Sequence, residues 1–148
     1  MDQKQRMHEI VESFREVKKA FYQLLSQQAD IYGITGIQFM ALKAIQNNPQ
    51  IGVTELADVL RLGNSTVSGV IDRLEKANLV VRKRSDSDRR SVTLEITEKG
   101  REIYLQTDQK YSEVISGVLN TAEEDIEHLL ITHRKIIESL EKAREGNL

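Results

Sequence analysis

Residues 53–97 decide how this chain folds: VTELADVL (53–60), RLG (61–63), NSTVSGVIDRLEKA (64–77), NLVVRKR (78–84), SDSDRR (85–90) and SVTLEIT (91–97). The segments 53–60 and 64–77 have helical periodicity, whereas 80–85 and 91–96 alternate and are rich in β-branched residues. Two helices followed by a hairpin with a basic turn can lay one helix in a DNA groove while the hairpin grips the backbone. This stretch therefore predicts a DNA-reading unit.

The helix predicted over 64–77 has two chemically different faces. Its apolar residues recur at i, i+3, i+4 and i+7 and are Val67, Val70, Ile71 and Leu74. The other side carries small polar residues that suit contact with base edges: Asn64, Ser65, Ser68, Gly69 and Asp72. Asn64, Ser65 and Thr66 could instead serve only as a helix cap. A cap needs one such residue, however, and Ser68 continues the polar face, so we favour DNA contact.

The net charge of −2 conceals a basic segment. Residues 61–90 hold eight Lys and Arg against four Asp and Glu, whereas the rest of the chain holds 13 basic and 19 acidic residues. A basic patch on an acidic body is typical of a DNA-binding protein. Arg89 and Arg90 could form only a solvated turn, but Asp86 and Asp88 beside them can orient an arginine for a narrow groove.

Both ends of the chain predict long helices that each carry a narrow apolar seam. The N-terminal seam consists of Met7, Ile10, Phe14, Val17, Phe21 and Leu24, and the C-terminal seam of Ile126, Leu129, His133, Ile136 and Leu140. Seams of this spacing pack on other long helices. We therefore expect a homodimer that pairs the chain ends and presents two reading units.

Turn and cap residues predict the remaining helix boundaries: Gly33 as a stop, Thr35 with Gln38 and Thr121 with Glu124 as capping boxes, and Thr54 as a single cap. We interpret Gly100 as a close-packing position. Val92, Leu94 and Ile96 are expected to point one way and Thr93 and Glu95 the other. A two-stranded hairpin is marginal alone, so we expect it to lean on the helices.

Composition excludes several classes of protein. The 148 residues include no cysteine, which rules out disulfides, thiolate zinc sites and cysteine redox switches. Charges recur every few residues in the N-terminus, so it predicts neither a signal peptide nor a membrane span, and we expect a cytoplasmic protein. No phosphate loop or nucleophilic triad is apparent, so we expect no enzyme and no cofactor. The pairs His8 with Glu12 and His128 with His133 are too few ligands for a metal site.

The order of these elements and their motifs resembles the multiple-antibiotic-resistance regulator (MarR) family of winged-helix transcription factors. The resemblance is carried by ITGIQFMALKAI, TELADVL and LGNSTVSGVIDRLEKANLVVRKRSDSDRRSVTLEITEKG and covers nearly the whole chain. It implies a mainly α fold with a small β hairpin: a winged helix-turn-helix flanked by N- and C-terminal dimerisation helices. The corresponding segments are 1–32 for the N-terminal dimerisation helix, 33–97 for the DNA-binding domain and 98–148 for the C-terminal dimerisation helices. A well-known branch of the family senses oxidants through a cysteine, which this chain lacks.

The resemblance implies a homodimer on a palindromic operator, usually a repressor, often released by a small ligand. It places Asn64, Ser65, Thr66 and Ser68 in the major groove and Arg90 in the minor groove, with Asp88 beside it and Asp72 bracing the wing. From their charge and position we add four further DNA contacts, with Arg82 and Arg84 meeting phosphate: Arg73, Arg82, Arg84 and Arg89.

Five aromatic residues lie on helices that join the reading unit to the dimerisation helices: Tyr22, Tyr32, Phe39, Tyr104 and Tyr111. They could form ordinary core. They could also line a pocket for an aromatic or phenolic effector, since tyrosine puts a polar group in an apolar wall.

Two functions other than DNA readout stay open. A winged helix can serve as a protein-interaction module, but such a surface should expose aromatic and aliphatic residues, which the face of 64–77 lacks. A ligand- or metal-binding protein that has lost its DNA role would not need both Asp88 and Arg90. The operator, the effector and the sign of regulation do not follow from the sequence.

Overall fold

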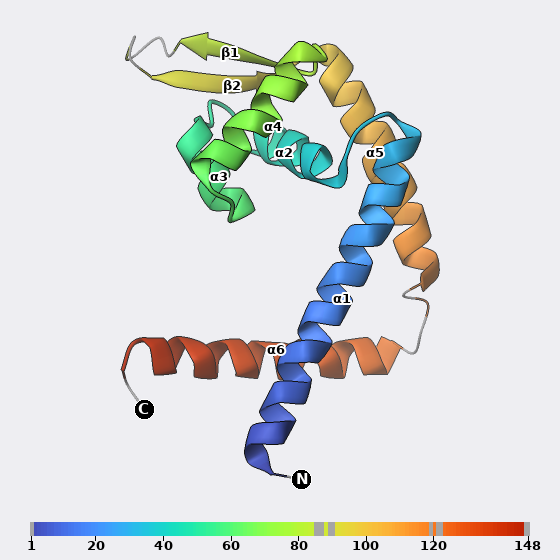
Figure 1. Cartoon of the computed structure of the whole chain (residues 1–148). Helices are drawn as coiled ribbons and strands as arrows, with labels where there is room; N and C mark the ends of the chain where they lie inside the picture. Colours follow the sequence, from blue (N-terminus) through green and yellow to red (C-terminus); the bar gives the residue numbers. More distant parts are fainter. Residues whose placement is uncertain (1, 85–87, 89–90, 119, 121–122, 147–148) are drawn as a thin grey trace. The chain divides into compact units, whose positions relative to one another are not determined.

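The computed structural model describes residues 2–84, 88, 91–118, 120 and 123–146. Helices and one hairpin follow each other in the predicted order (Figure 1). Their bounds are α1 (Gln3–Ile31), α2 (Gly36–Asn47), α3 (Val53–Leu60), α4 (Asn64–Lys76), β1 (Val80–Arg84), β2 (Val92–Ile96), α5 (Glu98–Val118) and α6 (Glu123–Arg144). The predicted fold class, mainly α with a small β hairpin, is confirmed.

Among the described residues, a hydrophobic core joins α2, α3, α4 and the hairpin, with Leu25 and Ala29 of α1 and Tyr104 of α5. The largest buried side chains at its centre are Leu42, Leu56, Ile71, Leu74 and Leu94. The inward stripe predicted for α4 is confirmed, because all four of its apolar residues are buried. This core fixes α4 between α3 and the hairpin and leaves its other face outside.

The hairpin is antiparallel, with Val80 opposite Ile96, Arg82 opposite Leu94 and Arg84 opposite Val92. The Leu94 N–H donates a hydrogen bond of 2.8 Å to the Ile51 carbonyl in the loop before α3, so the hairpin leans on the helices as expected. Val92 lies on the same face of the hairpin as Leu94 and Ile96, as the alternation predicts. Val92 forms the last pair before the turn, beyond the reach of the core, and is 41% exposed.

Local signals set most helix boundaries. Thr35 and Gln38 form the predicted capping box, with Gln38 N–H donating to Thr35 Oγ1 and Thr35 N–H to Gln38 Oε1. The predicted cap at Thr54 is wrong, because the N-cap of α3 is Gly52, two residues earlier, which has an extended backbone. The capping box predicted at Thr121 lies outside the described residues.

Gly100 is the close-packing position that the sequence predicts. A Cβ there would lie 2.1 Å from the Leu79 carbonyl oxygen, too close for any side chain. Thr97 stabilises the same junction, since its hydroxyl accepts from the Gly100 N–H and donates to the Asn78 carbonyl. The start of α5 is thereby tied to the end of α4.

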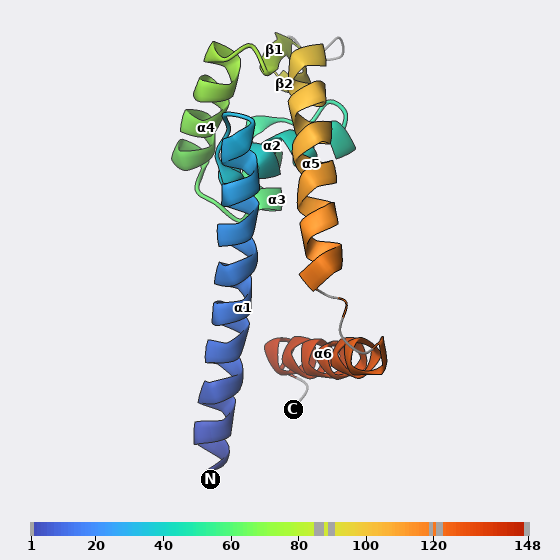
Figure 2. The same cartoon turned by 90° about the vertical axis from the view of Figure 1, so that its right-hand side faces the viewer.

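The chain divides into two compact units, residues 1–111 and 112–148. In the first, the N-terminal half of α1 extends away from the cluster of α2, α3 and α4 (Figure 2). Its seam residues Phe14, Val17 and Phe21 are exposed, and α6 has no buried residue. Each of the two predicted seams therefore includes exposed apolar side chains. No helix of the described ranges is long and apolar enough to cross a membrane.

Candidate nucleic-acid interface

The N-terminus of α4 does not use its polar residues as caps. The N-cap position is Gly63, which has no side chain to offer, and the helix proper begins at Asn64. Asn64, Ser65 and Thr66 are exposed. The capping explanation for these three residues is therefore excluded, and their side chains remain available to a partner.

One face of α4 points away from the core along its whole length. Ser65, Ser68, Gly69 and Asp72 follow each other at helical spacing on this face. A Cβ at Gly69 would meet nothing within 4 Å. The face is thus shallow and polar, and it can approach the edges of bases closely.

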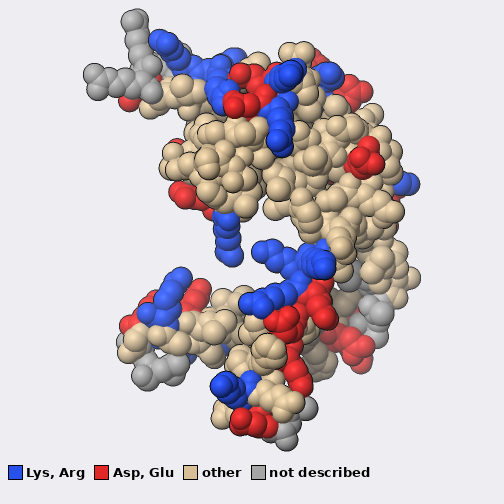
Figure 3. All heavy atoms as spheres, in the orientation of Figure 1, with Lys and Arg blue, Asp and Glu red and all other residues tan. Residues whose placement is uncertain are grey.

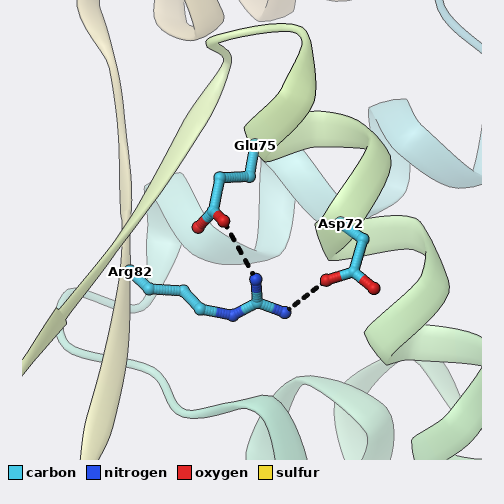
Figure 4. A network of polar contacts seen from close by, with 3 residues as sticks. All are labelled: Asp72, Glu75 and Arg82. Atoms are coloured by element: carbon cyan, nitrogen blue, oxygen red, sulfur yellow. Dashed lines mark hydrogen bonds and ion pairs between the residues drawn. The ribbon is translucent and has the colours of Figure 1, made fainter.

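Arg82 on β1 holds the hairpin against α4 (Figure 4). Its Nη2 lies 2.8 Å from Asp72 Oδ1, and its Nη1 lies 3.1 Å from Glu75 Oε1. The pKa of the Arg82 guanidinium is raised, mainly by the hydrogen bond to Asp72. Asp72 and Glu75 stand one turn apart on α4, so this clamp, defined as Asp72, Glu75 and Arg82, joins a strand to the outward face of the helix.

The clamp changes our interpretation of the basic residues on β1. Arg82 has two internal carboxylate partners, so we assign it to holding the hairpin instead of to phosphate contact. Lys83 pairs with Glu95 across the hairpin at 2.7 Å. Arg84 has no hydrogen-bond or ion-pair partner among the described residues, which leaves its charge available to DNA.

The role of Arg82 could be predicted from the alternation of side chains between the two faces of a strand. Val80, Arg82, Leu94 and Ile96 share the face of the hairpin that turns to the helices. Arg82 therefore faces α4 and not solvent. Glu75, the other clamp residue that sequence reasoning missed, lies three residues after Asp72 on the same helix.

The predicted arginines of the turn lie outside the described residues, so contacts of Arg89 and Arg90 stay predictions. Asp88 is described and accepts hydrogen bonds from the backbone and hydroxyl of Ser91. Asp72 was predicted to brace the wing through Arg90, and its described partner is Arg82.

Two further basic side chains lie on α4, the helix that carries the two carboxylates of the clamp. In Figure 3, Lys and Arg flank a small acidic cluster at the end of the molecule that carries α4 and the hairpin. Arg73 and Lys76 occupy the last turn of α4. Positive charge at this position is suited to contact with the phosphates of a nucleic acid.

An apolar hollow of about 480 Å³ lies beside α1, α2 and α3 in the first unit. Three of the five predicted aromatic residues line it, namely Tyr22, Phe39 and Tyr111, together with Lys18 and Lys43. Tyr104 is instead buried, with its ring stacked at 5.6 Å on Phe39, and Tyr32 is not among the lining residues. Burial raises the pKa of both Tyr104 and Tyr111, so both phenols are neutral near pH 7.

A second hollow of about 540 Å³ adjoins the first and shares Lys18, Tyr22, Met40, Val59 and Leu60 with it. Ile37, Arg61 and Leu62 complete its wall. Both hollows are mainly apolar with basic residues in the wall, which suits an aromatic anion. Across the described part of the chain, no three His, Asp or Glu side chains gather as a metal site would require.

Comparison with known proteins agrees with this geometry. The model of the MarR family matches residues 34–92, from the loop before α2 to the start of β2. The chain is 29% identical to the HTH-type transcriptional repressor NicR of Pseudomonas putida, over 92% of this chain and 89% of that protein. It is 25% identical to the HTH-type transcriptional regulator SarZ of Staphylococcus epidermidis, over 80% of this chain and 76% of that protein.

Solved structures share the whole architecture. A MarR family protein from Bacillus stearothermophilus superposes with a TM-score of 0.78 at 25% identity, covering 96% of this chain and 100% of that one. The S. aureus MepR–DNA complex superposes with a TM-score of 0.73 at 21% identity, covering 86% of this chain and 93% of that one. At this identity, the similarity to MepR shows a shared fold alone. The MepR structure is that of a complex with DNA.

Proposed function

Because the chain belongs to the MarR family of transcriptional regulators, we propose that it binds a palindromic operator as a homodimer and represses transcription until a small aromatic anion releases it. It is a regulator and not an enzyme. The observation that carries the proposal is the uncapped, polar outer face of α4, flanked by basic residues and held to the hairpin by the clamp.

The proposed contacts divide into two kinds. Asn64, Ser65, Thr66 and Ser68 read base edges, because their side chains are short, none of them caps the helix, the first three are exposed and Ser68 is part-exposed. Arg73 and Arg84 meet phosphates and position the helix. Arg90 reaches the adjacent minor groove with Asp88 beside it, as the family resemblance implies, and Arg89 is a further DNA contact. Arg82 and Asp72 position the hairpin.

A homodimer explains why the seams contain exposed apolar side chains. Leaving such side chains in water is unfavourable. They are Phe14, Val17 and Phe21 on α1 and Leu129 and Leu140 on α6. Pairing them with a second copy buries them and presents two equal α4 helices. The operator is then an inverted repeat with half-site centres about 10–10.5 bp, or a multiple of that distance, apart.

Sedimentation and footprinting test this assembly together. Sedimentation equilibrium should give a dimer at micromolar protein, and footprinting should protect two equal half-sites. Val17→Glu places a charge in the exposed seam and should dissociate the dimer and lower operator affinity. Glu16→Gln, its neighbour on the helix, is the matched control. A monomer that binds one half-site with full affinity would sink the proposal.

The aromatic hollow is the proposed effector site. Lys18 and Lys43 supply positive charge beside Tyr22, Phe39 and Tyr111, which matches a ring that carries a carboxylate. The hollow lies between α1, a proposed dimerisation helix, and α2 and α3 of the reading unit. A ligand releases DNA only to the extent that it prefers the arrangement that misaligns the two α4 helices.

Titration of the protein–operator complex tests the switch. 2-Hydroxybenzoate should lower operator affinity, benzyl alcohol should have little effect, and Lys43→Gln should weaken the response without changing ligand-free binding. If 2-hydroxybenzoate binds the protein and leaves operator affinity unchanged, the hollow is no switch.

A further inference from the structure

Three helices end with the same turn, and one of the three carries an unexpected residue. The left-handed residue after the helix is Gly33 for α1 (φ 77°), Asn78 for α4 (φ 62°) and Arg61 for α3 (φ 55°). In each turn the N–H of that residue donates to the carbonyl three residues back, and the next N–H donates to the carbonyl five residues back. This hydrogen-bond pattern is the Schellman motif, in which glycine is usual and asparagine is second.

Arginine at this position lowers the stability of the fold. Its Cβ crowds the backbone in the left-handed region, which glycine avoids and asparagine tolerates. No hydrogen bond or ion pair of the Arg61 side chain within the described ranges offsets that cost. Arg61 is exposed, and its side chain takes part in no hydrogen bond or ion pair within the described ranges.

The position of Arg61 indicates what the side chain serves. It lies in the turn that enters α4, two residues before the N-cap Gly63 and three before Asn64. A long cationic side chain there is next to the proposed reading face, and its guanidinium is matched to a phosphate.

We propose that Arg61 binds a phosphate of the operator backbone beside the half-site that α4 reads, and that the chain retains a strained arginine for this contact. The inference rests on the proposed DNA-binding function and adds a contact to it. DNA is the polyanion that membership of the family supplies. Arg61 also stands in the wall of the second hollow with Lys18, so a small anion in that hollow is the rival partner.

Substitutions at Arg61 separate strain from charge. Arg61→Gly and Arg61→Asn should raise the thermal midpoint of unfolding, by about 2–4 °C for the glycine variant. Both should weaken binding to every DNA sequence, by about tenfold for each phosphate hydrogen bond that the variant cannot make. The slope of log K against log salt should become shallower by about 0.9 for each phosphate released. Arg61→Lys keeps the charge and should keep the slope, with no gain in stability.

Asn78→Gly is the matched control, because it relieves the same backbone conformation at the other end of α4 without removing a charge. It should leave the salt slope unchanged. The inference is overturned if Arg61→Gly leaves operator affinity and slope at their wild-type values. It is equally overturned if Arg61→Gly leaves the slope unchanged but abolishes 2-hydroxybenzoate binding, which would assign Arg61 to the hollow.

The two proposals fail in distinguishable ways. A wild-type protein that binds no duplex selectively sinks the proposed function and this inference together. If the wild-type protein binds DNA selectively and substitution of Arg61 changes neither the affinity nor the salt slope, the inference alone is contradicted.

Discussion

Arg82 Nη2 on β1 lies 2.8 Å from Asp72 Oδ1 on α4, so an internal ion pair joins the wing hairpin to the proposed reading helix. The carboxylate stands on the same helical face as Ser65 and Ser68. A negative charge that faces DNA lowers the affinity by simple electrostatics. The presence of Asp72 on this face is explained if its role in positioning the hairpin contributes more to DNA binding than its charge takes away.

Asp72→Ala should therefore weaken operator binding although it removes a negative charge. Arg82→Ala should weaken it similarly, and the double variant should be little worse than either, because both remove one interaction. The coupling should be about 0.5–1 kcal/mol, as for partly exposed pairs. Mobility-shift titration at constant salt measures it. Tighter binding by Asp72→Ala would show that the pair does not organise the hairpin.

Arg84 and Ser68 should separate affinity from specificity. Arg84→Ala should weaken binding to all sequences and reduce the salt slope by about one for each phosphate contact. Ser68→Ala should change the preferred bases and leave the slope nearly unchanged. Titrations of two unrelated duplexes at several salt concentrations measure both effects. A change in sequence preference on Arg84→Ala with an unaltered slope would reverse these roles.

Gly100→Ala should destabilise the fold by about 1–3 kcal/mol, because the new Cβ would lie 2.1 Å from the Leu79 carbonyl oxygen. Gly117→Ala is the control on the same helix, since a Cβ there meets nothing within 4 Å. It should be neutral or stabilise by up to about 1 kcal/mol through helix propensity. Urea denaturation compares the two. Equal stability of both variants would contradict the close contact at Gly100.

Tyr104 should contribute to loss of stability in alkali. Burial raises its folded-state pKa above the unfolded value of about 10. The folded state therefore holds its proton more tightly, so its contribution is complete below about pH 10 and is lost as pH rises through the folded pKa. Tyr104→Phe should lose less stability than the wild type between about pH 9 and pH 11. Urea midpoints across that range check this, and identical pH dependence would contradict it.

Local sequence signals predicted the parts of the fold that depend on neighbouring residues. The Thr35–Gln38 capping box, the stripe of α4 and the tight packing at Gly100 each follow from spacing or from one residue type. The sequence pattern misplaces the cap at Thr54 because Gly52, two residues earlier, can also start a helix, and helix propensity does not separate the two.

Contacts between elements were harder to predict. The partner of Arg82 depends on how β1 packs against α4, and a run of basic residues does not show this. The alternation of side chains along the strand shows only that Arg82 lies on the inner face of the hairpin. The left-handed backbone of Arg61 is hidden because glycine or asparagine is expected there. Lys18 and Lys43 resemble ordinary solvated helix residues until α1 and α2 bring them to the same hollow.

Selection of bound duplexes from a random pool tests the central claim most directly, namely that α4 reads DNA in two symmetric copies. Wild-type protein should enrich an inverted repeat whose half-site centres lie about 10–10.5 bp, or a multiple of that distance, apart. The Ser65→Ala, Ser68→Ala double variant should enrich a different half-site at the same spacing. Enrichment of no sequence, or of one asymmetric site unaffected by these two serines, would contradict the account.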